Sequence, residues 1–206
     1  MSTRDKYAAL ADGFAEHEYA NPELYSSRRA GVIARLGPPV EAGDTVLDLC
    51  CADGIMAAPL TELGLSYTGV DATEAMVAAA ARRSPGLEFV TGRMEDFEPA
   101  QPVDVTICLR SFYLAEDRVA FFRRVRGYTR KKLVFDFRPM VFPIDGVLAQ
   151  LREAGFSRIE LRPFFLPQRK SLPGVALPLL SVLERTGPVG LALTNRVGCV
   201  FCSASA

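Results

Sequence analysis

The sequence predicts an α/β fold, in which helices cover both faces of a mostly parallel sheet. From Thr45 onward, short apolar runs alternate with longer amphipathic stretches, which is the pattern of strands and helices that alternate in parallel sheets. The composition, with 49% hydrophobic and 23% charged residues, is that of a globular protein with a packed core. A length of 206 residues without internal repeats or a Gly/Ser linker indicates one domain over residues 1–206.

The chain before Thr45 is expected to be helical. Residues 3–14 and 22–36 carry apolar side chains at helical spacing. Asn21 followed by Pro22 is typical of an N-cap with proline at the first helical position, and a Gly-Pro-Pro sequence ends the second helix. Residues up to about position 40 therefore form a helical segment ahead of the sheet.

Apolar runs predict the strands, and amphipathic stretches between the early runs predict helices. The expected strands are residues 45–49, 66–70, 87–90, 103–109, 131–137, 158–162 and 197–203, and the expected helices are 55–63, 73–83 and 117–128. Thr73 is the expected N-cap of the second of these helices. Ligands of such sheets bind beyond the carboxyl ends of the strands, so functional residues are expected just after the early strands.

A leucine- and proline-rich excursion, residues 164–196, precedes the last strand. Pro173 and Pro178 interrupt its helical pattern, so it is not expected to span a membrane. Its apolar side chains either complete the core or line a pocket for a lipophilic molecule.

Two acidic positions after the first two strands predict a nucleotide site. The sequence VLDLCCADG places Asp48 and Asp53 on either side of a tight turn that leads into a helix, where backbone N–H groups can meet a polar ligand. Asp71 ends the second strand in YTGVDAT, at roughly the 20-residue spacing where a Rossmann fold holds ribose hydroxyls. A carboxylate suits this role because it accepts two hydrogen bonds at once. Alternatively, Asp71 caps the following helix, and Asp48 is a buried acid that ties the turn together.

Four motifs in this order, VLDLCCADG, YTGVDATEAMV, LEFVTGRMEDF and PVDVTICLRSFYLAE, resemble those of class I S-adenosylmethionine-dependent methyltransferases. The resemblance implies a Rossmann-like three-layer sandwich with a seven-stranded, mostly parallel sheet and an antiparallel last strand. It also implies S-adenosyl-L-methionine as the cofactor. The residues it assigns to cofactor binding are Asp48, Cys50, Cys51, Ala52, Asp53 and Gly54 around the methionine part, Asp71 at the ribose, Ala72, Met76, Arg93 and Met94 at the adenosine, and Leu109 and Arg110 at the methionine end.

The chain departs from the family pattern in two places. Cys50 and Ala52 stand where the family usually has its first two glycines, which leaves Gly54 alone. Because a Cβ restricts the backbone and the approach of a ligand, the turn is expected to lie slightly farther from the cofactor. Arg93 stands where the family often has an acid, so adenine is left to backbone oxygens or to Asp96.

In this family a lid usually comes from the N-terminal helices and the segment before the last strand, here residues 1–40 and 164–196. The candidate substrate residues are Phe14, Tyr19, Tyr113, Asp136 and Arg138. Tyr25 and Arg29 share one helix face, and they either meet the carboxylate of the cofactor or are a core tyrosine and a surface arginine. His17, the only histidine, is the candidate general base or otherwise part of the lid.

The charge balance and the cysteines limit the partners. Lys+Arg and Asp+Glu number 24 each, so no overall field favours nucleic acid or an anionic membrane over a small-molecule acceptor. The basic residues between Arg123 and Lys132 are expected to form a solvated helix end. Cys199 and Cys202 form a CxxC inside a strand, where they point to opposite faces, so no metal site is expected.

These patterns favour methyl transfer to a small, partly lipophilic metabolite. A cytoplasmic protein is expected, because the N-terminus has no apolar signal segment and the cysteines form no disulfide framework. It is expected to be a monomer or a homodimer. Because two of the family's glycines are missing, the alternative is a repurposed methyltransferase fold that acts as a binding module or a cyclase. A nicotinamide enzyme would need more glycines than the sequence CCADGI contains.

Overall fold

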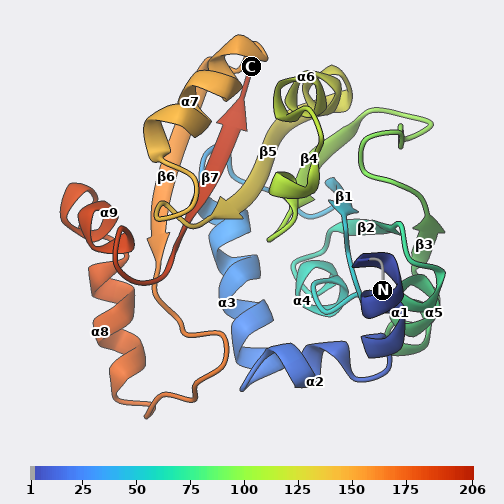
Figure 1. Cartoon of the computed structure of the whole chain (residues 1–206), viewed down its shortest axis with the longest axis horizontal. Helices are drawn as coiled ribbons and strands as arrows, with labels where there is room; N and C mark the ends of the chain where they lie inside the picture. Colours follow the sequence, from blue (N-terminus) through green and yellow to red (C-terminus); the bar gives the residue numbers. More distant parts are fainter. Residues whose placement is uncertain (1–2) are drawn as a thin grey trace.

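The computed structural model describes residues 3–206, and its centre is one seven-stranded sheet (Figure 1). The strands are β1 Thr45–Leu49, β2 Ser66–Asp71, β3 Glu88–Thr91, β4 Val103–Cys108, β5 Thr129–Phe137, β6 Arg158–Phe164 and β7 Cys199–Ser205. They lie in the order β3-β2-β1-β4-β5-β7-β6, and β7 runs antiparallel to both of its neighbours while the other pairs are parallel. The predicted sheet, with its antiparallel last strand, is therefore confirmed.

Helices cover both faces of this sheet (Figure 1). They are α1 Thr3–Leu10, α2 Phe14–Glu18, α3 Pro22–Arg35, α4 Ala57–Thr61, α5 Glu74–Arg83, α6 Arg118–Tyr128, α7 Ile144–Glu153, α8 Ala176–Leu183 and α9 Pro188–Thr194, with a short 3₁₀ helix at Phe112–Leu114. Successive strand residues point to opposite faces. Leu133 of β5 accordingly packs in the cluster that contains side chains of α6 and α7, and Val134 packs with those of α3 and α4. The Rossmann-like three-layer sandwich is confirmed.

Some predicted helix ends are wrong, for local reasons. The expected helix 3–14 is two helices, because Gly13 with φ 76° turns the chain between them. The helix expected at 55–63 is shorter, since the turn after β1 extends to Met56. Thr73 occupies the N-cap position of α5, but its side chain makes no capping hydrogen bond. Asp71 Oδ1 instead accepts from the Thr73 N–H at 2.9 Å.

Both ends of α3 are held by side chains. Asn21 Oδ1 accepts from the Leu24 N–H at 2.9 Å, which confirms the predicted N-cap. At the other end, Lys132 Nζ donates to the carbonyls of Ile33 at 2.6 Å and Leu36 at 2.8 Å. Burial lowers the pKa of Lys132 to about 8. The prediction that Lys132 belongs to a solvated helix end is wrong, because it supplies a buried partner for the last carbonyls of α3.

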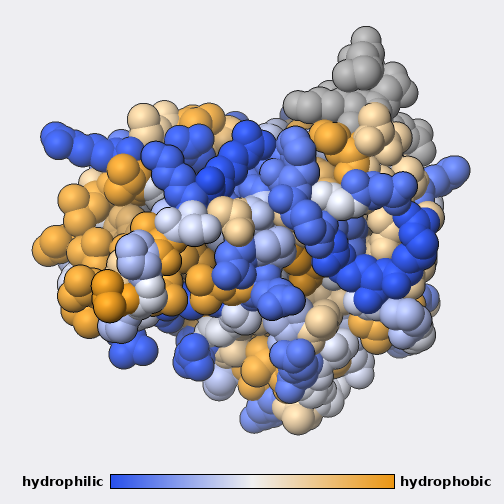
Figure 2. Space-filling model, turned by 90° about the horizontal axis from the view of Figure 1, so that it is seen from below, coloured by the Kyte–Doolittle hydropathy of each residue, from blue (hydrophilic) through white to orange (hydrophobic). Residues whose placement is uncertain are grey.

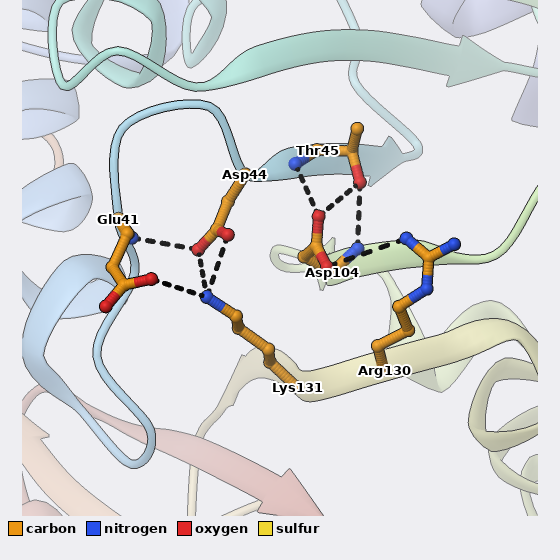
Figure 3. Close-up of polar contacts among 6 residues, drawn as sticks. All are labelled: Glu41, Asp44, Thr45, Asp104, Arg130 and Lys131. Carbon is orange, nitrogen blue, oxygen red and sulfur yellow. Dashed lines mark hydrogen bonds and ion pairs between the residues drawn. The ribbon is translucent and has the colours of Figure 1, made fainter.

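Polar contacts join β1, β4 and β5 at the end of the sheet where β1 begins (Figure 3). The N–H and hydroxyl of Thr45 donate to Asp104 Oδ2 at 2.9 and 2.8 Å. Lys131 Nζ donates to both carboxylate oxygens of Asp44 at 2.8 Å, and Arg130 lies 3.6 Å from Asp104. Two more members of the basic run are therefore paired with acids. Their contacts align the starts of β1, β4 and β5.

The excursion before β7 contributes to the core. Leu172, Leu177 and Leu180 pack against the cluster that contains the buried side chains of α3. These leucines therefore complete the core, which is the first of the two roles expected for this segment. Within residues 3–206, no helix is both long and apolar enough to cross a bilayer.

Cys199 and Cys202 lie on opposite faces of β7, as strand geometry requires. Cys199 packs with the α3 side of the sheet and Cys202 with the α6 side. Burial raises the pKa of both thiols. Across the part of the chain that the structure describes, no three His, Cys, Asp or Glu side chains are grouped to hold a metal ion.

Gly54 offers a test of the packing between the β1 turn and α5. It has φ +74°, and a Cβ there would lie 2.9 Å from Ala80 Cβ, whereas Gly86 has φ +88° with nothing within 4 Å. We expect Gly54→Ala to lower the free energy of unfolding by roughly 2–5 kcal/mol and Gly86→Ala by roughly 1–2 kcal/mol, because only the first adds overpacking to an unfavourable backbone. Chemical denaturation measures both values. Equal losses would contradict the close contact.

Candidate functional site

A cavity of about 560 Å³ opens at the carboxyl ends of β1, β2 and β4. This volume lies within the range of roughly 300–1,000 Å³ that is typical of small-molecule sites. The predicted site residues that line it are Phe14, Tyr19, Arg29, Asp48, Cys50, Cys51, Ala52, Asp71, Ala72, Met76, Arg93, Met94, Leu109, Arg110 and Tyr113. The fold therefore gathers residues from the N-terminal helices and from the first four strand ends around one space.

Some predicted residues do not line the cavity. They are His17, Tyr25, Asp53, Gly54, Asp136 and Arg138. Asp53 Oδ2 accepts from the Ala15 N–H at 3.0 Å and from Arg83 Nη2 at 2.8 Å, so it faces α2 and α5. Gly54 packs against α5. The predicted cofactor contacts of Asp53 and Gly54 are corrected accordingly: these residues attach the turn to the neighbouring helices.

The turn after β1 has a glycine-like backbone although it carries side chains. Cys50 has φ 61° and Ala52 has φ 50°, both in the left-handed region that favours glycine. Asp71 Oδ2 accepts from the Ala52 N–H at 3.0 Å, and its other oxygen accepts from the Thr73 N–H. One carboxylate thus ties the turn to the start of α5. The Cβ atoms of Cys50 and Ala52 therefore do not prevent a left-handed backbone, although each left-handed residue costs roughly 1–2 kcal/mol.

Asp48 is a buried acid with one strong partner. It is 2% exposed, and the Tyr67 hydroxyl donates to its Oδ2 at 2.7 Å. Asp48 accepts no backbone N–H of the described residues, so the predicted role of tying the turn together belongs to Asp71. Burial raises the pKa of Asp48 to about 7, although Tyr67 and the nearby Arg29 favour its charged form. A cation bound next to Asp48 in the cavity would stabilise the charged form of this carboxyl group.

Arg29 of α3 reaches the cavity through a buried ion pair. Its Nη2 lies 2.7 Å from Asp136 Oδ2, and the two side chains are 3% and 4% exposed. The other Asp136 oxygen accepts from the Arg110 N–H at 2.6 Å, and Arg110 has φ 59°. Both oxygens of Asp136 are therefore engaged by the protein. The predicted contact between Asp136 and substrate is corrected to a role in holding Arg29 and Arg110.

Arg29 also has an unused donor. Its Nε is buried without a hydrogen-bond partner among the described residues. Tyr25 packs in the core between Tyr19 and Phe164, with ring centres 4.6 and 5.6 Å away. Tyr25 is therefore a core tyrosine, which was one of the two alternatives. Arg29 is buried and lines the cavity, so it is not a surface arginine. A buried donor without a partner costs free energy unless a ligand accepts from it.

The predicted adenosine region lies at the end of the cavity near β2 and β3. Met76 and Met94 are buried there. The Arg93 side chain is 57% exposed, and its Nε lies 3.4 Å from Asp96 Oδ2. Asp96 contacts Arg93 and does not line the cavity. The structure thus does not place Asp96 at the cavity, and adenine recognition by backbone oxygens stays a prediction.

The cavity also contains residues that were not predicted. The cavity residues missed from the sequence are Tyr7, Leu10, Glu18, Ile55, Met56, Thr73, Glu95, Ser111, Leu114 and Arg169. Helical spacing connects Tyr7 and Leu10 with Phe14, and this signal could have found them. Glu18 and Arg169 meet at 2.7 Å although they are 151 positions apart, and no local pattern marks such a pair.

Two predicted acceptor-side residues lie outside the lining of the cavity. The side chain of His17 is 57% exposed and lies 3.3 Å from Glu18, which takes the cavity position on α2. Arg138, the residue after β5, is exposed. The predicted roles of His17 as a base in the cavity and of Arg138 at the substrate are corrected, because neither side chain lines the site.

Comparison with known proteins agrees with this arrangement. Residues 46–132 match a family model described as a methyltransferase domain. This segment is similar to methyltransferase domains. It contains β1 to β4, the turn after β1 and Asp71, which carry most of the predicted cofactor residues. No curated protein matches the sequence.

Solved structures share the fold of the whole chain at low identity. A putative methyltransferase of Haloferax volcanii, in complex with the Trm112 activator, is 18% identical with a TM-score of 0.72, covering 100% of this chain and 98% of that one. Magnesium protoporphyrin IX methyltransferase of Synechocystis, with bound S-adenosylmethionine, is 15% identical with a TM-score of 0.58, covering 100% and 85%. The [4+2]-cyclase SpnF is 17% identical with a TM-score of 0.67, covering 98% and 94%. The chain has the class I methyltransferase fold.

Replacing Ala52 by glycine tests the left-handed turn after β1. We expect Ala52→Gly to raise the free energy of unfolding by up to about 1 kcal/mol, because the relieved backbone strain exceeds the added entropy of the unfolded chain. Ala58, exposed on α4, is the matched control, and Ala58→Gly should lower the same free energy by about 1 kcal/mol. Urea denaturation measures both. A loss in both variants would contradict the positive φ of Ala52.

Asp48 makes stability depend on pH. Since its pKa of about 7 lies above the ordinary value of 3.8, the folded state holds more protons between these values, and stability falls as pH rises through this window. We expect Asp48→Asn to flatten the free energy of unfolding against pH there, by at most about 4 kcal/mol for such a shift. Tyr67→Phe should extend the fall to higher pH, because it removes a donor to the charged carboxylate. An unchanged profile in Asp48→Asn would contradict the raised pKa.

Proposed function

We propose that the protein transfers the methyl group of S-adenosyl-L-methionine to a small, partly lipophilic metabolite. The observation that carries this proposal is the turn after β1, where Cys50 and Ala52 have φ values of 61° and 50° and Asp71 accepts from the Ala52 N–H. The family's glycines would produce the same backbone shape, which presents N–H groups to a ligand. Holding it with side chains costs free energy, and such strain is typical of ligand sites.

The cavity residues suit each part of the cofactor. The unpartnered Nε of Arg29 would donate to the carboxylate of the methionine part. Asp48, whose pKa burial raises to about 7, would accept from the ammonium group beside it. Asp71 has lone pairs beyond its two backbone N–H bonds, and these would accept from ribose hydroxyls. Met76 and Met94 offer apolar surface to adenine.

Bound S-adenosylmethionine supplies a methyl group that is already activated by a sulfonium charge. The protein then chiefly has to orient the acceptor and exclude water. Phe14 and Tyr113 would form an apolar wall for the acceptor, and Tyr19 and Glu18 are cavity groups that can orient an O–H or N–H. We propose no histidine base, because His17 does not line the cavity. In this proposal α1 and α2 act as the lid.

A ligand-binding module or cyclase on the same fold is the second candidate. It is supported by the cyclase SpnF among the similar structures and by the replaced glycines at Cys50 and Ala52. Incubation with methyl-labelled cofactor and cell extract, separated into organic and aqueous phases, distinguishes the candidates. Label in an organic-soluble product supports the proposed acceptor class, and label only in the aqueous phase contradicts it. Cofactor binding without any labelled product favours the second candidate.

Asp71→Asn tests the cofactor assignment, because it keeps the side-chain shape and replaces one acceptor oxygen by a donor. We expect binding of S-adenosylhomocysteine to weaken by about 1.5–3 kcal/mol, roughly ten- to over a hundredfold, since hydrogen bonds to an ionised group have this size. Isothermal titration calorimetry measures the change.

The 2′-deoxy analogue of the same ligand separates ribose contact from damage to the turn. If Asp71 accepts from the ribose, the penalty of Asp71→Asn should be smaller for the analogue than for the parent ligand. Equal penalties would mean that Asp71 acts only by holding the Ala52 and Thr73 N–H groups. An unchanged affinity in a folded variant would contradict the assignment.

A further inference from the structure

An apolar patch is exposed on α8, α9 and the chain that follows them. It consists of Val175, Leu179, Val182, Val189, Leu193 and Val197, and the first three side chains are 81%, 72% and 64% exposed. Val175, Leu179 and Val182 lie at helical spacing, so they share one side of the α8 segment. Figure 2 shows apolar residues gathered at the left of the view, the side where α8 and α9 lie in Figure 1. We call these six residues the α8–α9 patch. Contiguous exposed patches of this kind mark contact surfaces.

The exposed charges of the segment that carries this patch have one sign. The exposed charged residues of segment 166–197 are Arg169, Lys170, Arg185 and Arg196. The acid of the segment, Glu184, is buried and lies 2.7 Å from Arg28. Arg169 contacts Glu18, but Lys170, Arg185 and Arg196 form no ion pair with any side chain that the structure describes. The chain is neutral as a whole, yet an uncompensated positive charge borders the α8–α9 patch.

We propose that the α8–α9 patch docks onto the surface of an anionic lipid bilayer. Its apolar side chains would enter the boundary between headgroups and acyl chains, and the basic residues beside it would meet lipid phosphates. Charge complementarity selects this occupant over a second copy of the chain, because self-association through the patch would bring the same basic residues together. With 8 and 7 residues, α8 and α9 are too short to span a bilayer, so the docking is peripheral.

The segment that leads into the α8–α9 patch reaches the cavity at one residue, although none of the six patch residues lines the cavity. Arg169 both lines the cavity and begins the basic, apolar segment. Resting on the proposed function, docking of the patch would bring a bilayer to the same segment whose Arg169 lines the acceptor site. The docking itself needs no cofactor, so its test is independent of methyl transfer.

Co-sedimentation of the full chain with vesicles tests the proposal. We expect binding to vesicles of equal parts phosphatidylcholine and phosphatidylglycerol, and much weaker binding to phosphatidylcholine alone. Leu179→Asp should weaken binding by about tenfold or more, because it places a charge in the apolar face. Lys170→Glu and Arg185→Glu should each weaken it by at least about fivefold, the effect of one basic residue near an anionic surface. The matched control is Leu63→Asp, at a residue that is 41% exposed outside the patch, and it should bind like the unaltered chain.

Several results would overturn the proposal. One is a folded chain that does not sediment with anionic vesicles, and another is equal loss of binding in Leu179→Asp and Leu63→Asp. Light scattering that shows a dimer abolished by Leu179→Asp would assign the patch to a second copy instead. Thermal unfolding and binding of S-adenosylhomocysteine are measured on every variant, so a misfolded variant is recognised and replaced by Val182→Ser, which should also weaken vesicle binding.

Discussion

The buried ion pair between Arg29 and Asp136 is the contact on which the cavity depends most. It joins α3 to β5 at 2.7 Å, and the second oxygen of Asp136 holds the left-handed bend at Arg110 after β4. Removing either partner would leave an uncompensated buried charge, at a cost of about 3–5 kcal/mol. Lys132, on the same strand as Asp136, binds the last carbonyls of α3. β5 therefore positions both α3 and the side chain of Arg29, which lines the cavity.

Asp71 connects the stability of the domain to the proposed binding of cofactor. Its carboxylate accepts from the Ala52 N–H and from the N–H of Thr73 at the N-cap of α5, and Asp71 also lines the cavity that the ribose would occupy. Since a ligand that binds only the folded turn stabilises it by mass action, cofactor binding and the strained backbone support each other. In the proposed function, this coupling would offset the strain of the side chains at Cys50 and Ala52, where the family usually has glycine. The retained Gly54 has a different cause, the close approach of Ala80 on α5.

The excursion before β7 shows how one segment can serve two surfaces. Leucines on one side of it complete the core, while Val175, Leu179 and Val182 remain exposed on the other side. The balanced total charge conceals the basic character of this region, because its acid, Glu184, is buried against Arg28. A global charge count therefore gave no indication of an anionic membrane as partner, whereas the distribution of charge over the folded surface does.

The sequence by itself determined the seven strands, the helices between the early strands, the N-cap at Asn21 and the place of Asp71 after β2, because side-chain periodicity and capping are local properties. It also predicted most of the cavity, since strand ends of a parallel sheet meet at one edge. It did not predict α7, α8 and α9. Only the tertiary structure decided which way side chains near that edge face. Asp53, His17 and Asp136 turn from the cavity because partners distant in sequence, or a neighbour on the same helix, occupy the alternative positions. Contacts such as Glu18 with Arg169 arise only when the chain folds, so no local pattern could reveal them.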